Sequence, residues 1–317
     1  MKVNTKNKLL TTLSIIKVMV IFTIFFFASP TNIFAQDQPQ NVEVKMKDGS
    51  TVIGELIEDT SEKLVVKSST MGEMVILKSN ILEYRKLRSV KTVGGEYWHE
   101  NPNPTRNLYG PTGYGLRKGE GYYQNFMIFV NSISYGFTDH FTLGVGFEIV
   151  SLLGAFNDVG NTTFPGFSIA PKWSIPIKKD KWNVGVGALA LHIPGQEELF
   201  SAGGLYGVST WGSIDNNFSL GLAFGVAEGG FSARPTITIA GNYRVGRRFG
   251  LVTENWFVPA DGAFGGIITF GGRYIGERVT WDLSILGLGG AIDGNGGFVL
   301  SPIPLIGATI PFGTGWK

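Results

Sequence analysis

From residue 122 onward, large apolar residues alternate with small or polar ones, and this pattern restricts the chain to few folds. In residues 141–149 one face holds Phe141, Leu143, Val145, Phe147 and Ile149, and the other holds Thr142, Gly144, Gly146 and Glu148. Segments 218–226 and 279–285 repeat the pattern. A period of two residues indicates β-strands with one apolar and one polar face. Such strands suit either a soluble β-sandwich or a barrel surrounded by lipid.

The connections between these segments favour the barrel. Short connections (138–140, 178–181, 215–217, 246–248 and 276–278) alternate with longer Gly/Asn-rich ones (154–162, 194–201, 228–234, 259–263 and 290–297). Short turns at the periplasmic end and longer outer loops are typical of outer-membrane barrels. The short turns carry basic residues, such as Lys179 and Arg247, whereas the long loops carry acidic residues: Asp158, Glu197, Glu198, Asp261 and Asp293.

Aromatic residues flank the short turns and predict an interfacial girdle, because amphipathic rings are favoured at the headgroups of a membrane. They are Phe137, Phe141, Trp182, Trp211, Phe218, Tyr243, Phe249, Tyr274 and Trp281. We therefore predict an all-β chain whose main part is a transmembrane antiparallel β-barrel in the outer membrane, in contact with its lipid.

Composition excludes several classes of function. The 317 residues include no cysteine, which rules out disulfides, thiolate nucleophiles and cysteine-based metal sites. A net charge of +2 gives no electrostatic basis for nucleic-acid binding. The histidines, His99, His140 and His192, are too dispersed for a metal site. The Gly-rich stretches 287–290 and 294–297 do not lead from a strand into a helix, so they are not phosphate loops. We expect no enzymatic activity, no cofactor and no metal.

The first 35 residues have the pattern of a signal peptide. Lysines at positions 2, 6 and 8 precede an apolar run at 18–28, and Ala35 is a plausible cleavage residue. The run is short for a transmembrane helix. We expect residues 1–35 to be removed and the mature N-terminus to lie in the periplasm.

Residues 41–88 form a separate region with five short strand patterns, at 42–46, 51–57, 63–68, 73–77 and 81–84. The stretches "VKMKDGSTVIGELIEDTSEKLVV" and "MVILKSNILEY" resemble the small Sm-like (SH3/Sm) five-stranded barrel. Members of that family often bind RNA through the loop after the second strand. Here that loop, 59–62, has no aromatic residue for base stacking, so we expect a periplasmic module that either contacts other envelope proteins or acts like a plug. Residues 89–104 are expected to be a linker.

The stretch "LYGPTGYGLRKGEGYYQNFMIFVNSISYGFTDHFTLGVGFE" resembles outer-membrane barrel proteins of Bacteroidetes-type Gram-negative bacteria. The resemblance implies a fold and a location, and no reaction. We assign residues 105–317 to the barrel and count about twelve strands, beginning with 105–116 and 122–137 and ending with 279–288 and 298–312. An even number is what single-chain bacterial barrels require.

Charged residues at inward positions are the candidate lumen residues: Glu148, Lys172, Arg244, Glu254, Arg273 and Asp282. We expect Glu148 to pair with Lys172 and Arg273 with Asp282. Such pairs either offset each other's desolvation or form a constriction that selects solutes by charge. The predicted function is passive passage of small solutes through a polar, charge-lined lumen. The alternative is a non-conducting structural or partner-binding envelope protein that docks through residues 41–88 or the acidic loops.

Overall fold

The computed structural model describes residues 40–87, 90–94, 96–157, 165–194, 200–227, 230–260, 263–289 and 302–313. The expected signal peptide, and the five acidic residues expected in the long loops, lie outside these residues. The described chain forms two compact units: residues 101–311, and residues 40–100 with 312 and 313. Within the described ranges no helix is long and apolar enough to cross a membrane.

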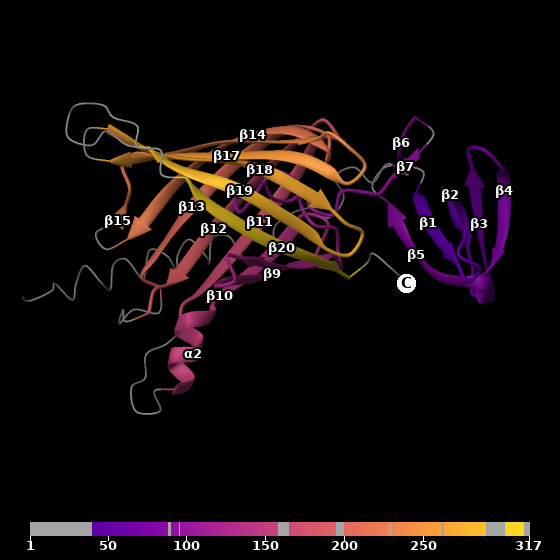
Figure 1. Cartoon of the computed structure of the whole chain (residues 1–317), viewed down its shortest axis with the longest axis horizontal. Coiled ribbons are helices and arrows are strands. Elements are labelled where there is room, and N and C mark those ends of the chain that lie inside the picture. The colour runs from indigo at the N-terminus through magenta and orange to yellow at the C-terminus, as the bar shows by residue number, and fades with distance from the viewer. Residues whose placement is uncertain are drawn as a thin grey trace, which may run out of the picture. The chain divides into compact units, whose positions relative to one another are not determined.

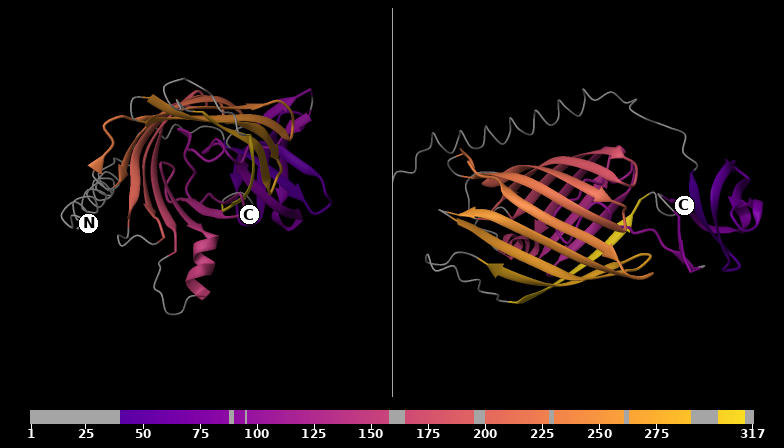
Figure 2. Two further views of the ribbon diagram at one scale, coloured as in Figure 1. Left: turned by 60° about the vertical axis from the view of Figure 1, so that its left-hand side comes forward. Right: turned by 90° about the horizontal axis from the view of Figure 1, so that it is seen from above.

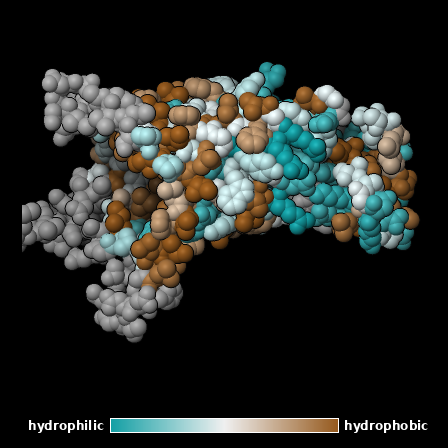
Figure 3. All heavy atoms as spheres, in the orientation of Figure 1, coloured by the Kyte–Doolittle hydropathy of each residue, from teal (hydrophilic) through white to brown (hydrophobic). Residues whose placement is uncertain are grey.

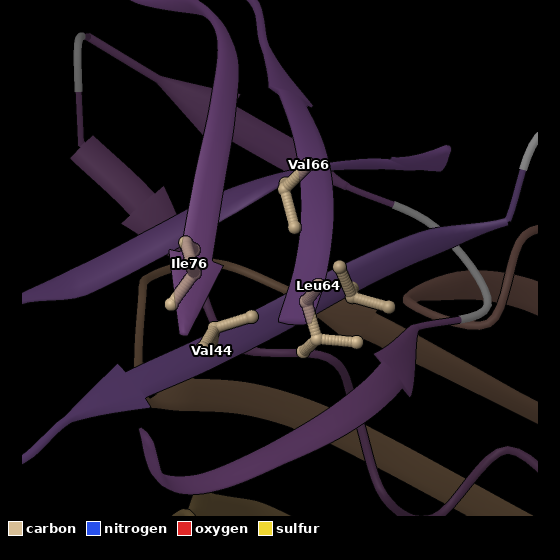
Figure 4. Close-up of a cluster of buried hydrophobic side chains, with 5 residues drawn as sticks. Val44, Leu64, Val66 and Ile76 are labelled. Atoms are coloured by element: carbon tan, nitrogen blue, oxygen red, sulfur yellow. The ribbon is translucent and has the colours of Figure 1, made fainter. Parts of the chain in front are cut away.

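The smaller unit contains the five antiparallel strands that the sequence predicts. They are β1 (Asn41–Met46), β2 (Thr51–Asp59), β3 (Lys63–Ser68), β4 (Gly72–Leu77) and β5 (Ile81–Leu87), in the order β4-β3-β2-β1-β5, with the 3-10 helix η1 (Lys78–Asn80) before β5. Its core is built from alternate residues of neighbouring strands: Val42, Val44, Leu64, Val66 and Ile76 (Figure 4).

A buried carboxylate connects this sheet to the residues that follow it. Glu43 is 1% exposed and lies 2.8 Å from the Arg85 guanidinium, and the Tyr97 hydroxyl donates a hydrogen bond to it at 3.2 Å. Burial and the neighbouring Glu43 carboxylate raise the pKa of Tyr97. Tyr97 lies in a two-stranded hairpin of β6 (Lys91–Val93) and β7 (Glu96–Trp98), where the sequence predicts only an irregular linker.

Leu64→Ala tests the small core. Leu64 is completely buried, so its truncation leaves a cavity that should lower the free energy of unfolding of this unit by about 2–5 kcal/mol. Denaturant titration followed by circular dichroism measures the change. An exposed apolar neighbour, Leu77→Ala, is the control and should change stability little.

The larger unit is a closed antiparallel β-barrel of twelve strands (Figure 1). The strands are β8 (Gly121–Phe126), β9 (Val130–Gly136), β10 (Phe141–Glu148), β11 (Phe167–Lys178), β12 (Trp182–His192), β13 (Ala202–Gly212), β14 (Asn216–Ala227), β16 (Thr236–Arg244), β17 (Phe249–Ala260), β18 (Ala263–Ile275), β19 (Thr280–Gly289) and β20 (Ile303–Phe312). Strand β8 lies beside β20 and closes the ring, and the two-residue strand β15 (Gly230–Phe231) extends the sheet beside β14.

The five predicted short turns connect strands at one end of the barrel, which we call the turn end; the opposite end is the loop end. Aromatic residues next to these turns are cross-strand neighbours: Phe141 with Trp173, Trp182 with Trp211, Trp211 with Phe218, Phe249 with Tyr274, and Tyr274 with Trp281. The predicted aromatic girdle is therefore confirmed at the turn end. Between the ends, exposed apolar side chains cover the strands (Figure 3).

Two elements of the predicted strand count are wrong, although the total of twelve is right. Segment 105–116 is not a strand of the barrel wall, because its polar groups bind buried side chains of β11, β17 and β19 in the interior. Segment 122–137 is not one strand but the hairpin β8–β9, which reverses at residues 127–129. A third difference is the helix α2 (Ile149–Asn157), which forms where the sequence predicts the end of a strand and the start of a loop.

A charge placed on the outer face tests the membrane assignment of the barrel. Leu222 lies near the middle of β14 and is 47% exposed, so Leu222→Lys should cost about 2–4 kcal/mol of folding free energy in liposomes. The matched control is Ala223→Ser on the lumen face of the same strand, which should change stability much less. Equal tolerance of both substitutions would contradict an outer face in contact with lipid.

Candidate functional site

Residues 101–119, which we call the lumen segment, lie inside the ring of strands rather than in it (Figure 2). The segment folds into a small hairpin in which the Thr112 N–H donates to the Thr105 carbonyl at 3.0 Å and the Asn107 N–H donates to the Gly110 carbonyl at 2.8 Å. Most of its side chains are buried; Thr112 is 0% exposed and Leu108 is 3% exposed, whereas Lys118 near the end of the segment is exposed. The interior of the barrel is therefore occupied by the chain itself.

An aspartate between two arginines attaches this hairpin to the wall. Arg106 of the lumen segment lies 2.9 Å from Asp282 of β19, and Arg273 of β18 lies 2.6 Å from the other oxygen of the same carboxylate. Arg106 also donates to the Thr309 hydroxyl at 2.6 Å, and Arg273 donates to the Asn107 carbonyl. Among the described residues these arginines are the two largest fully buried side chains, so the aspartate offsets a large desolvation cost.

Glu254 of β17 holds the tip of the hairpin. Its Oε2 accepts the N–H groups of Leu108 and Tyr109 at 2.8 and 3.0 Å, and its Oε1 accepts the Gly110 N–H at 2.8 Å. The Trp256 indole N–H donates to Oε1 at 2.7 Å. A carboxylate with four donors and 1% exposure is fully engaged, so it presents no free charge to a solute.

Lys172 of β11 binds the other side of the hairpin through its carbonyls. Its Nζ donates to the carbonyls of Tyr114, Thr105 and Thr112 at 2.6, 3.2 and 3.3 Å. An ammonium group has three protons to donate, and here all three are directed at the lumen segment. The wall therefore binds the N–H groups of the hairpin tip with the carboxylate of Glu254, and it binds carbonyl groups of the lumen segment with the ammonium group of Lys172.

The sixth candidate, Glu148, does not face Lys172, and the expected pair is wrong. Glu148 is the last residue of β10, and its carboxylate accepts the N–H groups of Val150 and Ser151 at 2.7 and 2.8 Å, at the first turn of α2. Acidic groups are favoured there because the first amides of a helix lack intrahelical partners. Sequence alternation placed Glu148 on the inward face without showing that its strand ends at this residue.

The remaining candidates divide into two groups. Arg273 and Asp282 are brought together as the sequence suggests, whereas Arg244 pairs at 2.9 Å with Asp215, a residue of a short turn that was not a candidate. Arg106 was missed as well, although it bonds to both Asp282 and Thr309 of the wall. A basic residue within a run of Pro and Gly, opposite an inward aspartate, is the signal that identifies it.

Glycines allow the lumen segment to pass close to the wall. A β-carbon added at Gly110 would lie 2.6 Å from the Glu254 carboxylate, and one added at Gly113 would collide with the Asn183 carbonyl of β12. Neither contact is compatible with a larger side chain in this position. These glycines are therefore needed for the close approach of the lumen segment to the wall, and not for the conformation of a turn.

On the loop side of the hairpin, a cavity of about 600 Å³ remains, which we call the lumen cavity. Its aromatic residues are Tyr109 from the lumen segment and Tyr122, Tyr206, Phe224 and Trp256 from the wall; most of the rest are Gly, Ala, Ser, Thr and aliphatic residues. Tyr109 and Trp256 stack with ring centroids 6.2 Å apart. The charged residues that line it are all engaged: Lys172 and Glu254 bind the lumen segment, and Arg106 of that segment binds Asp282.

Within the described part of the chain, no group of His, Asp or Glu residues is arranged to hold a metal ion. The histidines of the barrel serve in packing. His192 stacks on Phe167 with centroids 5.5 Å apart, and His140 stacks on Trp173 at 6.1 Å.

No protein-family model matches the chain, and no curated protein is significantly similar to it. Solved structures with a similar arrangement of strands include the NanC porin, at 14% identity and a TM-score of 0.37 over 61% of this chain and 98% of that one. OmpT, an outer-membrane protein of Vibrio cholerae, has 9% identity and a TM-score of 0.33 over 89% and 100% of the two chains. A Rhodopseudomonas blastica porin mutant has 11% identity and a TM-score of 0.33 over 86% and 99%. Similarities of this size assign no solute and no activity to this chain.

Removal of the shared carboxylate tests the charge network. Asp282→Asn leaves Arg106 and Arg273 buried without their counter-charge, so it should destabilise the barrel by about 3–5 kcal/mol. The control, Asp180→Asn, removes a carboxylate from an exposed turn, where asparagine accepts the positive φ of 55°, and should have little effect. Urea titration of the barrel in detergent measures both.

Proposed function

We propose that this protein is a gated outer-membrane passage for small solutes, whose resting state is closed by its own lumen segment. The observation that carries the proposal is the hairpin at 105–112, which is buried inside the barrel and bound by Lys172, Glu254 and Asp282. The short turns face the periplasm, and the lumen cavity faces the loop end. A solute enters the cavity, and passage requires displacement of the hairpin.

The wall contacts suit a segment that is held firmly and can still be released. Most of them are hydrogen bonds to backbone groups of the hairpin, such as the Glu254 contacts with Leu108 and Gly110. Water can replace such partners when the hairpin moves, because the released backbone groups and the lumen charges then become solvated together. An open barrel of twelve strands lies between those filled by side chains and those with a wide channel.

A second role, for the smaller unit, is the binding of another envelope protein in the periplasm. We propose that residues 41–88 form an Sm-like module for this purpose. Apolar side chains on its outer strands are exposed, including Val75 and Leu77 of β4 and Leu82 of β5. Strand β4 is an edge of the sheet, and an edge offers unpaired backbone groups to a partner.

Planar-bilayer recording tests the gate. The wild-type protein should be closed for most of the time, whereas the double variant Lys172→Met, Glu254→Gln should show frequent stepwise openings, because the hairpin loses the charged partners of its backbone groups on two sides. Heat-modified gel mobility confirms that the variant barrel is folded.

A tethered hairpin provides the matched control. The Asn242 amide donates to the Asn107 side-chain oxygen at 2.8 Å, so Asn107→Cys and Asn242→Cys can be joined by a short bifunctional thiol reagent in a chain that has no other cysteine. The tether, added to the double variant, should suppress the openings. Steady conduction by the wild type that the tether leaves unchanged would contradict the gate.

A further inference from the structure

The barrel wall is unusually low along one side. Strands β8 and β9 have six and seven residues, whereas β17 and β18 have 12 and 13. Seven residues at about 3.3 Å each, tilted by about 40°, rise only about 18 Å, while the apolar band of an outer-membrane barrel is about 25 Å tall. Because Phe137 of the turn-end girdle directly follows β9, the other end of the hairpin falls about 7 Å short of the far interface.

The residues at this tip are apolar. The turn consists of Met127, Ile128 and Phe129, and Ile128 is 68% exposed. Val130 and, on the neighbouring helix α2, Val150 are also about half exposed. A turn in water is normally rich in Gly, Asn, Asp or Pro, and this turn contains none of them. Its composition suits hydrocarbon.

Several backbone groups of the tip are bonded within the protein, as a turn in hydrocarbon requires. Asn125 donates to the Ile128 carbonyl at 3.0 Å, and Asn131 donates to the Phe129 carbonyl at 3.2 Å. The Met127 N–H donates to the Ile306 carbonyl of β20 at 2.9 Å. Asn125 and Asn131 are opposite one another in the register and bond to each other at 2.8 Å, and Asn131 is only 3% exposed. The amides that bind the turn are therefore supplied by the protein's own side chains.

The lumen cavity lies directly behind this low wall. Tyr122 and Gln124 of β8 and Ser132 of β9 line it, and two further cross-strand pairs, Asn125 with Asn131 and Phe126 with Val130, separate it from the tip. We propose that the β8–β9 hairpin ends inside the membrane and is the lipid-side entrance of the lumen cavity, for a single acyl chain or an equally slender amphiphile. This rests on the proposed function and names its solute class. The apolar rim at Phe126 and Val130 and the engaged charges of the cavity favour such a ligand over a charged solute.

The depth of the tip is measured with a unique label, since the chain has no cysteine. Ile128→Cys carries an environment-sensitive fluorophore in liposomes with nitroxides either deep in the acyl chains or at the headgroups. The deep nitroxide should quench the fluorophore on Ile128→Cys more strongly than the headgroup nitroxide does, and the same result is expected at Leu222→Cys. The fluorophore on Asp180→Cys, in a turn, should instead be quenched by iodide in the water. Iodide quenching at Ile128→Cys that equals that at Asp180→Cys overturns the proposal.

The entrance is tested from inside the cavity. Thr238 of β16 lines it on the lumen face. A fatty acid with a nitroxide near the end of its chain should quench a fluorophore on Thr238→Cys in a saturable way. Adding Ser132→Trp, which fills the space behind the hairpin, should abolish that quenching and leave quenching at Leu222→Cys unchanged. The lipid-side entrance is overturned if the fluorophore on Thr238→Cys is not quenched. It is also overturned if maltose, and not the fatty acid, protects the thiol of Thr238→Cys from a thiol reagent.

These measurements use the wild-type lumen segment, so they are independent of the gate. If the double variant Lys172→Met, Glu254→Gln shows channel openings but the fluorophore on Thr238→Cys is not quenched, the gate is supported and the lipid-side entrance is contradicted. If the double variant shows no openings but quenching at Thr238→Cys is saturable, the cavity binds a lipid and the barrel does not conduct.

Discussion

The structure depends on how a narrow barrel accommodates charge in its interior. Arg106 and Arg273 share the carboxylate of Asp282, and all three are at most 5% exposed. A charge in such a place is tolerated only with a partner and with its remaining donors satisfied. The wall supplies Arg273 and Asp282, but the second arginine and several of the acceptors come from the lumen segment. The barrel and its contents therefore stabilise each other, and neither is complete alone.

The outer face and the turns could be predicted from the sequence because they follow local rules. Alternation placed Phe141, Leu143 and Val145 on the lipid side, and basic, aromatic-flanked turns marked one end of the barrel. The five strands at 41–87 were readable for the same reason, since each is bounded by turn residues. Glu148 shows where such rules fail. A face is defined only while the strand continues, and the change to α2 at Ile149 gave its carboxylate a different partner.

The lumen segment and the β8–β9 hairpin could not be predicted because each departs from a local rule for a non-local reason. In the sequence, residues 105–116 follow a linker and precede the first regular strand, so the sequence predicts an edge strand; only the buried partners on β11, β17 and β19 show that they lie inside. The turn at 127–129 contains none of the residue types that favour turns, and Met127 and Ile128 adopt φ values of 54° and 68°. A conformation that is costly for a β-branched residue persists there because the surrounding hydrogen bonds fix it. The two errors cancelled in the strand count.

The lumen segment also determines which solutes the cavity can receive. Its hairpin engages Lys172 and Glu254 completely, which converts a charge-lined lumen into a cavity lined by aromatic rings and small residues. Tyr109 belongs to the hairpin and stacks on Trp256, whose indole N–H binds the same Glu254 oxygen as the Gly110 amide. A ligand that displaces the Tyr109 ring therefore disturbs the tip that Glu254 holds. If the proposed gate operates, the binding of a solute and the release of the hairpin act on the same few contacts, and the proposal therefore predicts that affinity for the cavity and opening of the lumen are coupled.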